Sequence, residues 1–243
     1  MGLKSLGWLA LFLAVMVVAE VRHIVSGDAL ILLMVLVPSV ILHEVSHGFV
    51  ALMFGDDTAK RAGRLTLNPF AHIDPIGSVL LPALLIFAGL TPIGYAKPVP
   101  VNVSRLRSPR DQSVLVSLAG PAVNVTLSLI AGILLHLRLS QILAQSNLLS
   151  SAQITVDPSL VDRIFFYMGA INLLLGVFNM IPIPPLDGSA VIERILPSAM
   201  LPGYYRLRML MLPVVLVLFL VFPNAIATVF NPIINLWLRI FVP

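Results

Sequence analysis

The sequence predicts an all-α polytopic membrane protein with about six transmembrane helices. Its 243 residues are 58% hydrophobic and only 11% charged, whereas ordinary globular domains carry about 25% charged residues. The mean hydropathy is +1.01, and long apolar stretches recur along the chain. These residues cannot supply the polar surface of a soluble domain, so we expect the lipid bilayer to be the solvent of the protein.

Several apolar stretches approach the roughly 20 residues that a spanning helix needs. They are 6–26, 29–54, 113–137, 162–184, 209–223 and 225–242. Lys4 precedes an apolar run, so residues 1–19 are similar to a signal sequence. Because further apolar stretches follow, we expect the first stretch to be retained as a transmembrane helix.

The stretch 76–95 is apolar but is interrupted by residues that break or kink helices. These residues are Pro82, Gly89, Pro92 and Gly94. Basic residues cluster on both sides of the stretch, so a single crossing would place one cluster outside, against the positive-inside rule. We therefore expect 76–95 to be a re-entrant or β-hairpin-like segment after the second helix.

With that topology and a cytoplasmic N-terminus, the basic residues divide unevenly between the two sides. All but three of the 15 lie on the cytoplasmic side, and the exceptions are Arg22, Arg138 and Arg163. The net charge of +4 is then explained by cytoplasmic loops, and we expect no nucleic-acid partner. The longest external connection, 138–161, is too short to hold a core of its own, so we expect residues 1–243 to form a single domain.

The second apolar stretch contains His43, Glu44 and His47 in the sequence HEVSH. Residues four apart share one face of a helix, so both imidazoles can reach one metal ion, with Glu44 beside them as a general base. The alternative is a pair of helix histidines with a stray carboxylate. That alternative is costly, because a charge at the middle of the membrane costs about 2.5–3.5 kcal/mol. The pattern therefore favours a metal site.

A catalytic zinc site usually has three protein ligands, so one more is expected elsewhere. The chain has no cysteine, which leaves as candidates Asp56, Asp57, His72, Asp74, His136 and Asp187. Asp56 and Asp57 follow a helix end, where a solvated turn is expected. Asp187 stands in NMIPIPPLDG, after prolines that end the fourth apolar stretch on the cytoplasmic side. The depth of that position favours Asp187.

Three motifs in order, HEVSHG, SLAGPAVN (117–124) and NMIPIPPLDG (179–188), resemble the site-2 protease family of intramembrane zinc metalloproteases. LTLNPFAHIDPIGS and YAKPVPVN are similar to further stretches of its compact prokaryotic members, which have no PDZ or CBS module. The resemblance covers roughly residues 29–208. It implies a three-helix catalytic core formed by 29–54, 113–137 and 162–184.

The resemblance also assigns roles to individual residues. It makes His43, His47 and Asp187 the ligands of one Zn²⁺ per chain, and it makes Glu44 the catalytic base. It places Asn179 and Asn124 near the site, where each could contact the oxyanion or the substrate. A buried asparagine can equally tie helices together.

The expected reaction is hydrolysis of a peptide bond in or near a transmembrane helix of a membrane-protein substrate. The expected partners are that transmembrane segment and the lipid bilayer, in a plasma (inner) membrane with the active site toward the cytoplasm. The Pro- and Gly-rich region 65–102 is a candidate for holding the substrate in extended form. The alternatives are a catalytically silent relative that binds membrane helices and a metal or proton transporter.

Overall fold

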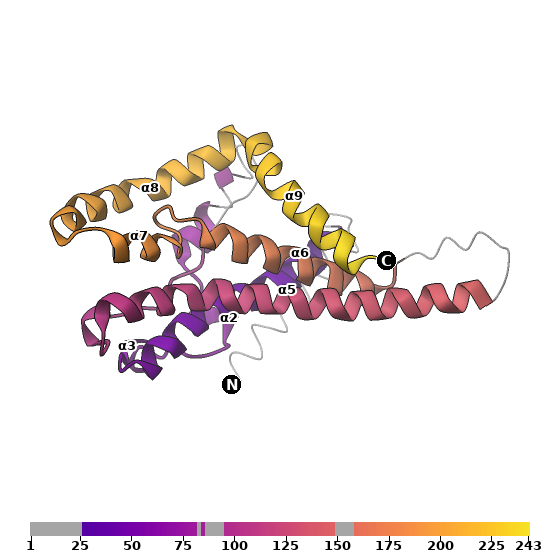
Figure 1. The fold of residues 1–243 in the computed structure, drawn as a ribbon, viewed down its shortest axis with the longest axis horizontal. Helices are drawn as coiled ribbons and strands as arrows, with labels where there is room; N and C mark the ends of the chain where they lie inside the picture. The colour runs from indigo at the N-terminus through magenta and orange to yellow at the C-terminus, as the bar shows by residue number, and fades with distance from the viewer. Residues whose placement is uncertain (1–25, 82–83, 86–94, 149–157) are drawn as a thin grey trace.

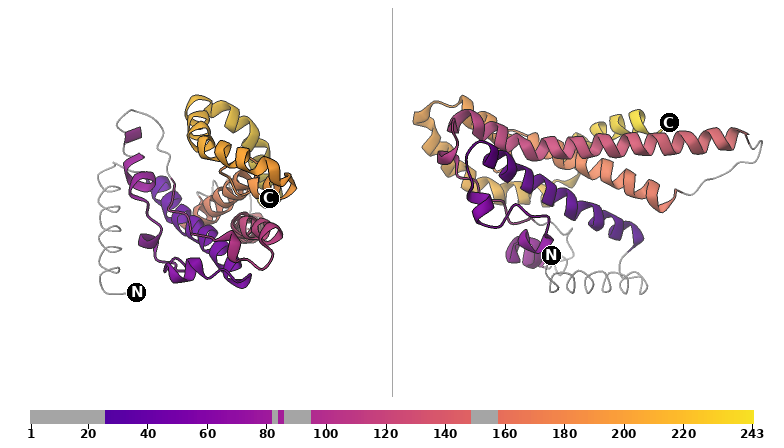
Figure 2. Two further views of the ribbon diagram at one scale, coloured as in Figure 1. Left: turned by 90° about the vertical axis from the view of Figure 1, so that its left-hand side faces the viewer. Right: turned by 90° about the horizontal axis from the view of Figure 1, so that it is seen from below.

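Three long helices form the centre of the molecule, which is a computed structural model describing residues 26–81, 84–85, 95–148 and 158–243. They are α2 (Gly27–Met53), α5 (Pro109–Leu148) and α6 (Leu160–Met180). All three lie side by side and contact one another (Figure 1), and they remain so when viewed from below (Figure 2). Each is long and apolar enough to cross a membrane. They correspond to the expected stretches 29–54, 113–137 and 162–184.

The starts of α2 and α6 follow from local capping. The hydroxyl of Ser26 accepts a hydrogen bond from the backbone N–H of Ala29. Ser159 and Asp162 form a capping box at the start of α6. Between the two helices, Ile31 and Val35 of α2 form a buried apolar cluster with an isoleucine of α6.

Two helix ends differ from the expected boundaries. Helix α6 ends at Met180 rather than at residue 184, because Pro182 forces Ile181 into an extended conformation. Helix α5 continues to Leu148 through residues expected to begin an external loop. The run 138–148 contains no proline or glycine, and its Leu, Gln and Ala residues favour a helix.

The C-terminal part of the chain adds α7 (Ser189–Ile195), α8 (Leu201–Val221) and α9 (Pro223–Phe241). Helices α8 and α9 form an inverted V above the central helices (Figure 1). Helix α9 returns to the core, and its Trp237 packs against Gly169 of α6. Within the residues described, three helices qualify as membrane spans, so the six expected spans are not confirmed.

The other expected segments fall partly outside the described residues. Almost all of the expected first helix, 6–26, lies there. The segment 76–95 begins in a π-helical turn, η2 (Pro75–Leu80), and most of its remainder also lies outside the described part. No strand occurs among the residues that are described, so the β-hairpin-like form is not confirmed.

Ion pairs join the central helices at the end where α6 begins, which we call the far end. Arg138 of α5 pairs with Asp162 of α6 at 2.7 Å. Arg163 of α6 pairs with Asp28 of α2. These two pairs connect all three central helices.

Candidate metal centre

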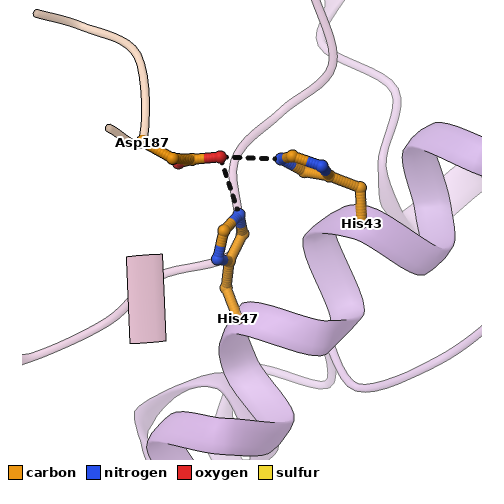
Figure 3. Close-up of side chains that lie close together, drawn as sticks. All are labelled: His43, His47 and Asp187. Carbon is orange, nitrogen blue, oxygen red and sulfur yellow. Dashed lines mark ion pairs between the residues drawn. The ribbon is translucent and has the colours of Figure 1, made fainter. Parts of the chain in front are cut away.

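Three side chains converge at the opposite end of the bundle, the site end (Figure 3). His43 and His47 lie one turn apart on α2, and both are buried. Asp187 comes from the loop after α6, and its Oδ2 lies 3.0 Å from Nε2 of His43 and 3.4 Å from Nε2 of His47. One ligand atom from each residue lies within 4.8 Å of the others. We call these three residues the His–Asp cluster.

The loop carrying Asp187 is closed tightly against the end of α6. The backbone N–H of Gly188 donates a 2.7 Å hydrogen bond to the carbonyl of Asn179. A Cβ atom at position 188 would lie 2.2 Å from the carbonyl oxygen of Met180. Only glycine permits this approach, which brings the preceding carboxylate back toward α2.

The second nitrogen of each imidazole is occupied by a partner on α5. Nδ1 of His47 donates to the backbone carbonyl of Val116 at 2.7 Å, and Nδ1 of His43 lies 2.5 Å from Oδ1 of Asn124. In the neutral imidazoles, both Nε2 atoms then present lone pairs toward the buried Oδ2 of Asp187. Three acceptors that face one another need a shared cation. Two imidazoles and a carboxylate suit a catalytic zinc ion.

Gly120 of α5 leaves the space beside these acceptors open. A Cβ atom at this position would lie 2.5 Å from Nε2 of His47 and 2.6 Å from Nε2 of His43. Even a methyl group would therefore crowd the nitrogen atoms that face Asp187. The glycine of SLAGPAVN thus has a steric reason.

Glu44 is half-buried beside the cluster, and a neighbouring segment holds it. Its Oε2 accepts a 2.8 Å hydrogen bond from the backbone N–H of Val99. Val99 stands between Pro98 and Pro100, which have no N–H, so it is the only donor of this type in the tripeptide. Arg64 fixes the same segment by donating to the carbonyls of residues 97 and 98.

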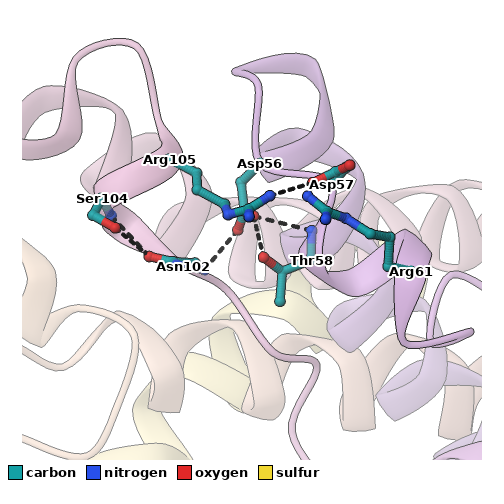
Figure 4. Close-up of polar contacts among 7 residues, drawn as sticks. All are labelled: Asp56, Asp57, Thr58, Arg61, Asn102, Ser104 and Arg105. Carbon is teal, nitrogen blue, oxygen red and sulfur yellow. Dashed lines mark hydrogen bonds and ion pairs between the residues drawn. The ribbon is translucent and has the colours of Figure 1, made fainter.

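Asp56, expected in a solvated turn, is fully buried instead (Figure 4). Its carboxylate accepts hydrogen bonds from the backbone N–H groups of Thr58 and Asn102 and from the Thr58 hydroxyl. Burial alone would raise the pKa of Asp56, but these hydrogen bonds lower it below its ordinary value. Its neighbour Asp57 pairs with Arg61 and Arg105. Both aspartates fix the end of α2 and lie outside the His–Asp cluster.

The remaining candidate ligands also lie outside the cluster. The Asp74 carboxylate accepts from two backbone N–H groups at the start of η2. Nε2 of His72 lies 2.9 Å from the backbone carbonyl of Thr66. His136 belongs to the part of α5 toward the far end. The contacts of His72 and Asp74 are thus with the backbone of their own loop.

The two asparagines singled out by the sequence lie in different environments. Asn124 is fully buried behind His43, and its Nδ2 donates a 2.7 Å hydrogen bond to Asn172 of α6. The side chain of Asn179 donates to the carbonyl of Leu175 within its own helix. Sequence reasoning missed Asn172 and its partner Ser39. The available signal was a polar side chain in the middle of an apolar helix.

Comparisons with known proteins agree with this geometry. The model of "Peptidase family M50" matches residues 31–222. The chain is 40% identical over 166 residues to "Putative zinc metalloprotease YwhC" of Bacillus subtilis, covering 68% of this chain and 69% of that protein.

More distant relatives are longer than the region they share with this chain. "Putative zinc metalloprotease Rip2" of Mycolicibacterium smegmatis is 32% identical over 64% of this chain and 53% of its own length. "Putative zinc metalloprotease Rip3" of Mycobacterium tuberculosis is 27% identical over 69% of this chain and 30% of its own length. This chain therefore spans about half of the one protein and a third of the other. No solved structure matches the chain significantly.

Proposed function

Given that the chain belongs to peptidase family M50, we propose that this zinc metalloprotease cuts a peptide bond in or near a transmembrane helix of a membrane protein. The His–Asp cluster carries the proposal, because its three acceptor atoms lie within 4.8 Å of one another, two of them on a helix suited to a membrane and the third in the loop after another. His43 and His47 through Nε2, and Asp187 through Oδ2, would hold the zinc ion. When bound, zinc polarises the scissile carbonyl and lowers the pKa of the attacking water.

Glu44 is the proposed general base. The Val99 N–H holds one of its carboxylate oxygens, and we assign the other oxygen to the proton of the attacking water. Glu44 then passes this proton to the leaving amine nitrogen, so one carboxylate serves both steps. Fixing the carboxylate before the reaction keeps it at the correct distance from the cluster.

A substrate helix must unwind before its peptide bond can be reached, and region 65–102 is our candidate for holding it extended. Within 97–99, the N–H groups and two of the carbonyls already bond to other parts of the chain. We therefore place substrate pairing nearer Leu65–Leu67, where Leu67 is 65% exposed. Proline in place of Leu67 should impair cleavage and leave the zinc content unchanged.

We further propose that the protein lies in a plasma (inner) membrane with its site end toward the cytoplasm. Basic residues are concentrated at the site end, in α3 (Thr58–Arg61), around 105–110 and in α7. The far end carries Arg138 and Arg163, both of which pair with aspartates. Arg239, in the last turn of α9, lies toward the same end and not with the cytoplasmic residues as expected, because Phe241 packs against Gly132 of α5. This asymmetry supports the cytoplasmic placement under the positive-inside rule.

The test is to reconstitute the protein in vesicles with extracted bacterial membrane proteins, as wild type and as Glu44→Gln. New protein N-termini are then identified by mass spectrometry, and zinc per chain is measured in both samples. We expect about one zinc in each and cuts within transmembrane segments only with wild type. Glu44→Gln is the matched control because it retains the cluster and the shape of the side chain.

Two results would overturn the proposal. Wild type without zinc, or with zinc that survives both His47→Ala and Asp187→Ala, would remove the metal site. Zinc-loaded wild type that generates no more transmembrane cuts than Glu44→Gln would remove the reaction.

A further inference from the structure

A chain of buried hydrogen bonds leaves α2, crosses α6 and α5, and returns to α2. It runs from Ser39 through Asn172 and Asn124 to His43, and we call these four residues the polar circuit. Ser39 and His43 are four residues apart, so they lie on one face of α2. Ser39 is 2% exposed, and both asparagines are fully buried. In a membrane bundle such groups are costly unless every one is paired.

The direction of each hydrogen bond in the circuit is fixed by backbone carbonyls, which can only accept. The Ser39 hydroxyl donates to the carbonyl of Val35 at 2.7 Å, so its oxygen is left to accept from Asn172. The Nδ2 of Asn172 also donates to the carbonyl of Met168. Turning this amide around would place its oxygen against that carbonyl, so the orientation is determined.

The same reasoning continues to the histidine. Because Nδ2 of Asn172 is committed to Ser39 and Met168, its Oδ1 must accept from Asn124. Asn124 therefore donates through Nδ2 and presents Oδ1 to His43. His43 must then carry its hydrogen on Nδ1, which leaves the lone pair of Nε2 facing Asp187.

We propose that Asn172 and Ser39, acting through Asn124, are positioning residues that set the tautomer and ring orientation of His43 for zinc. The inference rests on the proposed zinc site, and it assigns a function to two residues that touch neither the cluster nor Glu44. Partners of this kind behind a metal-bound histidine change metal affinity about 10- to 100-fold when they are removed.

A second buried hydrogen bond between the same two helices serves as a matched control. The Ser128 hydroxyl donates at 2.8 Å to the carbonyl of Gly169, and Ser128 is 1% exposed. It lies one turn along α5 from Asn124 and connects α5 to α6, and this hydrogen bond ends on a backbone carbonyl instead of leading to a histidine. If Asn172 had only a structural role, losing its hydrogen bonds and losing that of Ser128 would have the same effect on zinc affinity.

The experiment is a zinc competition titration against a chromophoric chelator, on detergent-purified protein. We expect Asn172→Leu to raise the zinc Kd about 10- to 100-fold. We expect Ser128→Ala to leave it within about twofold of wild type, because its loss removes a helix tie and no histidine partner.

If Asn172→Leu does not fold, two smaller changes, Ser39→Ala and Ser39→Thr, test the same positioning role. The alanine variant should raise the Kd in the same direction but less, and the threonine variant should restore it because it keeps the hydroxyl. Nitrogen NMR of zinc-free protein, with ¹⁵N-labelled histidine, should show His43 protonated on Nδ1 in wild type and a changed tautomer ratio in Ser39→Ala.

The outcomes separate the inference from the function on which it rests. Equal zinc affinities for Asn172→Leu and Ser128→Ala, or for both Ser39 variants and wild type, would overturn the positioning role and leave the zinc site standing. A wild type that binds no zinc would overturn both.

Discussion

The two ends of the central bundle join the same three helices by different chemistry. At the far end, Arg138–Asp162 and Arg163–Asp28 are charged pairs, and one or both partners in each are partly exposed. At the site end, the polar circuit is neutral, and its asparagines are fully buried. An ion pair accepts many geometries and weakens with salt. A chain of amides has a donor end and an acceptor end, so it fixes both position and hydrogen placement.

This difference indicates that the two ends have different roles: the far end anchors the helices, and the site end positions side chains precisely. The far end holds the helices together where small shifts are harmless. The site end must place the three proposed ligand atoms to within about 0.5 Å, and hydrogen bonds between uncharged side chains do so without adding charge near the proposed metal site. Changes at the site end should therefore affect zinc and catalysis, and changes at the far end should affect stability alone.

The largest effect is expected from Gly120→Ala at the site end. The added methyl group would meet Nε2 of both histidines within 2.6 Å, so we expect zinc affinity to fall by more than the roughly 100-fold typical of a lost outer partner. The control is Gly132→Ala, whose methyl group would meet the ring of Phe241. That variant should bind zinc normally. Normal zinc binding by Gly120→Ala would show that the cluster is not the metal site.

The second effect concerns Glu44, which is held by a backbone group. Val99→Pro removes the N–H that Glu44 accepts, and the neighbouring prolines already favour an extended backbone. We expect kcat to fall by up to about 100-fold, with KM and zinc content close to wild type. Val99→Ala keeps the N–H and should retain most activity. Equal turnover by the two variants would mean that the Val99 N–H does not position Glu44 for catalysis.

The third effect lies at the far end. Arg138→Ala leaves Asp162, which is 3% exposed, with Ser159 as its remaining partner. We expect a loss of about 1–2 kcal/mol in stability, since Arg138 itself is partly exposed. Thermal unfolding in detergent measures this loss, and the zinc Kd should not change. Arg163→Ala should cost less, because the side chain of its partner Asp28 is 55% exposed, whereas that of Asp162 is only 4% exposed. A changed zinc Kd in Arg138→Ala would contradict the division between the two ends.

The smallest effect is a dependence of stability on pH through Asp56. Its pKa is lower in the folded protein than in the unfolded chain, so its stabilising contribution is present at neutral pH and is lost as the pH falls through the acidic range. Asp56→Asn should therefore lower the unfolding temperature at pH 7, and the deficit should shrink on acidification. A deficit that does not shrink when the pH is taken well below 3.8, the ordinary pKa of an aspartate, would mean that the charge is not responsible.

The sequence predicted best what depends on neighbours in the chain. His43, Glu44 and His47 share one helix, so their spacing alone predicted their common face. Asp187 required the membrane topology as well, and the structure brings it to the two histidines. The polar circuit could not be predicted, because it depends on how three helices pack in register. Ser39 and Asn172 stood out only as polar residues in apolar stretches, and nothing in the sequence pairs them.

Local rules failed where the context outweighed them. Asp56 looked like a turn residue, but segment 95–102 passes over it, and Asn102 completes its burial. The extent of α5 beyond residue 137 was missed because polarity was read as a loop, although no helix breaker was present. The role of Gly120 could be recognised only once the positions of both imidazoles were known, because a side chain there would clash with them.

The order of the polar circuit along the chain bears on how the protein is made. His43 lies in the first described helix, whereas Asn124, Asn172 and the proposed third ligand, Asp187, are synthesised later. A ribosome-bound chain with only α2 and α5 inserted would hold two histidines, without Asn172 to orient Asn124 and without the carboxylate. The proposed zinc site therefore stays incomplete until the loop after α6 has been made, so we expect the nascent chain to have no proteolytic activity while it is being inserted.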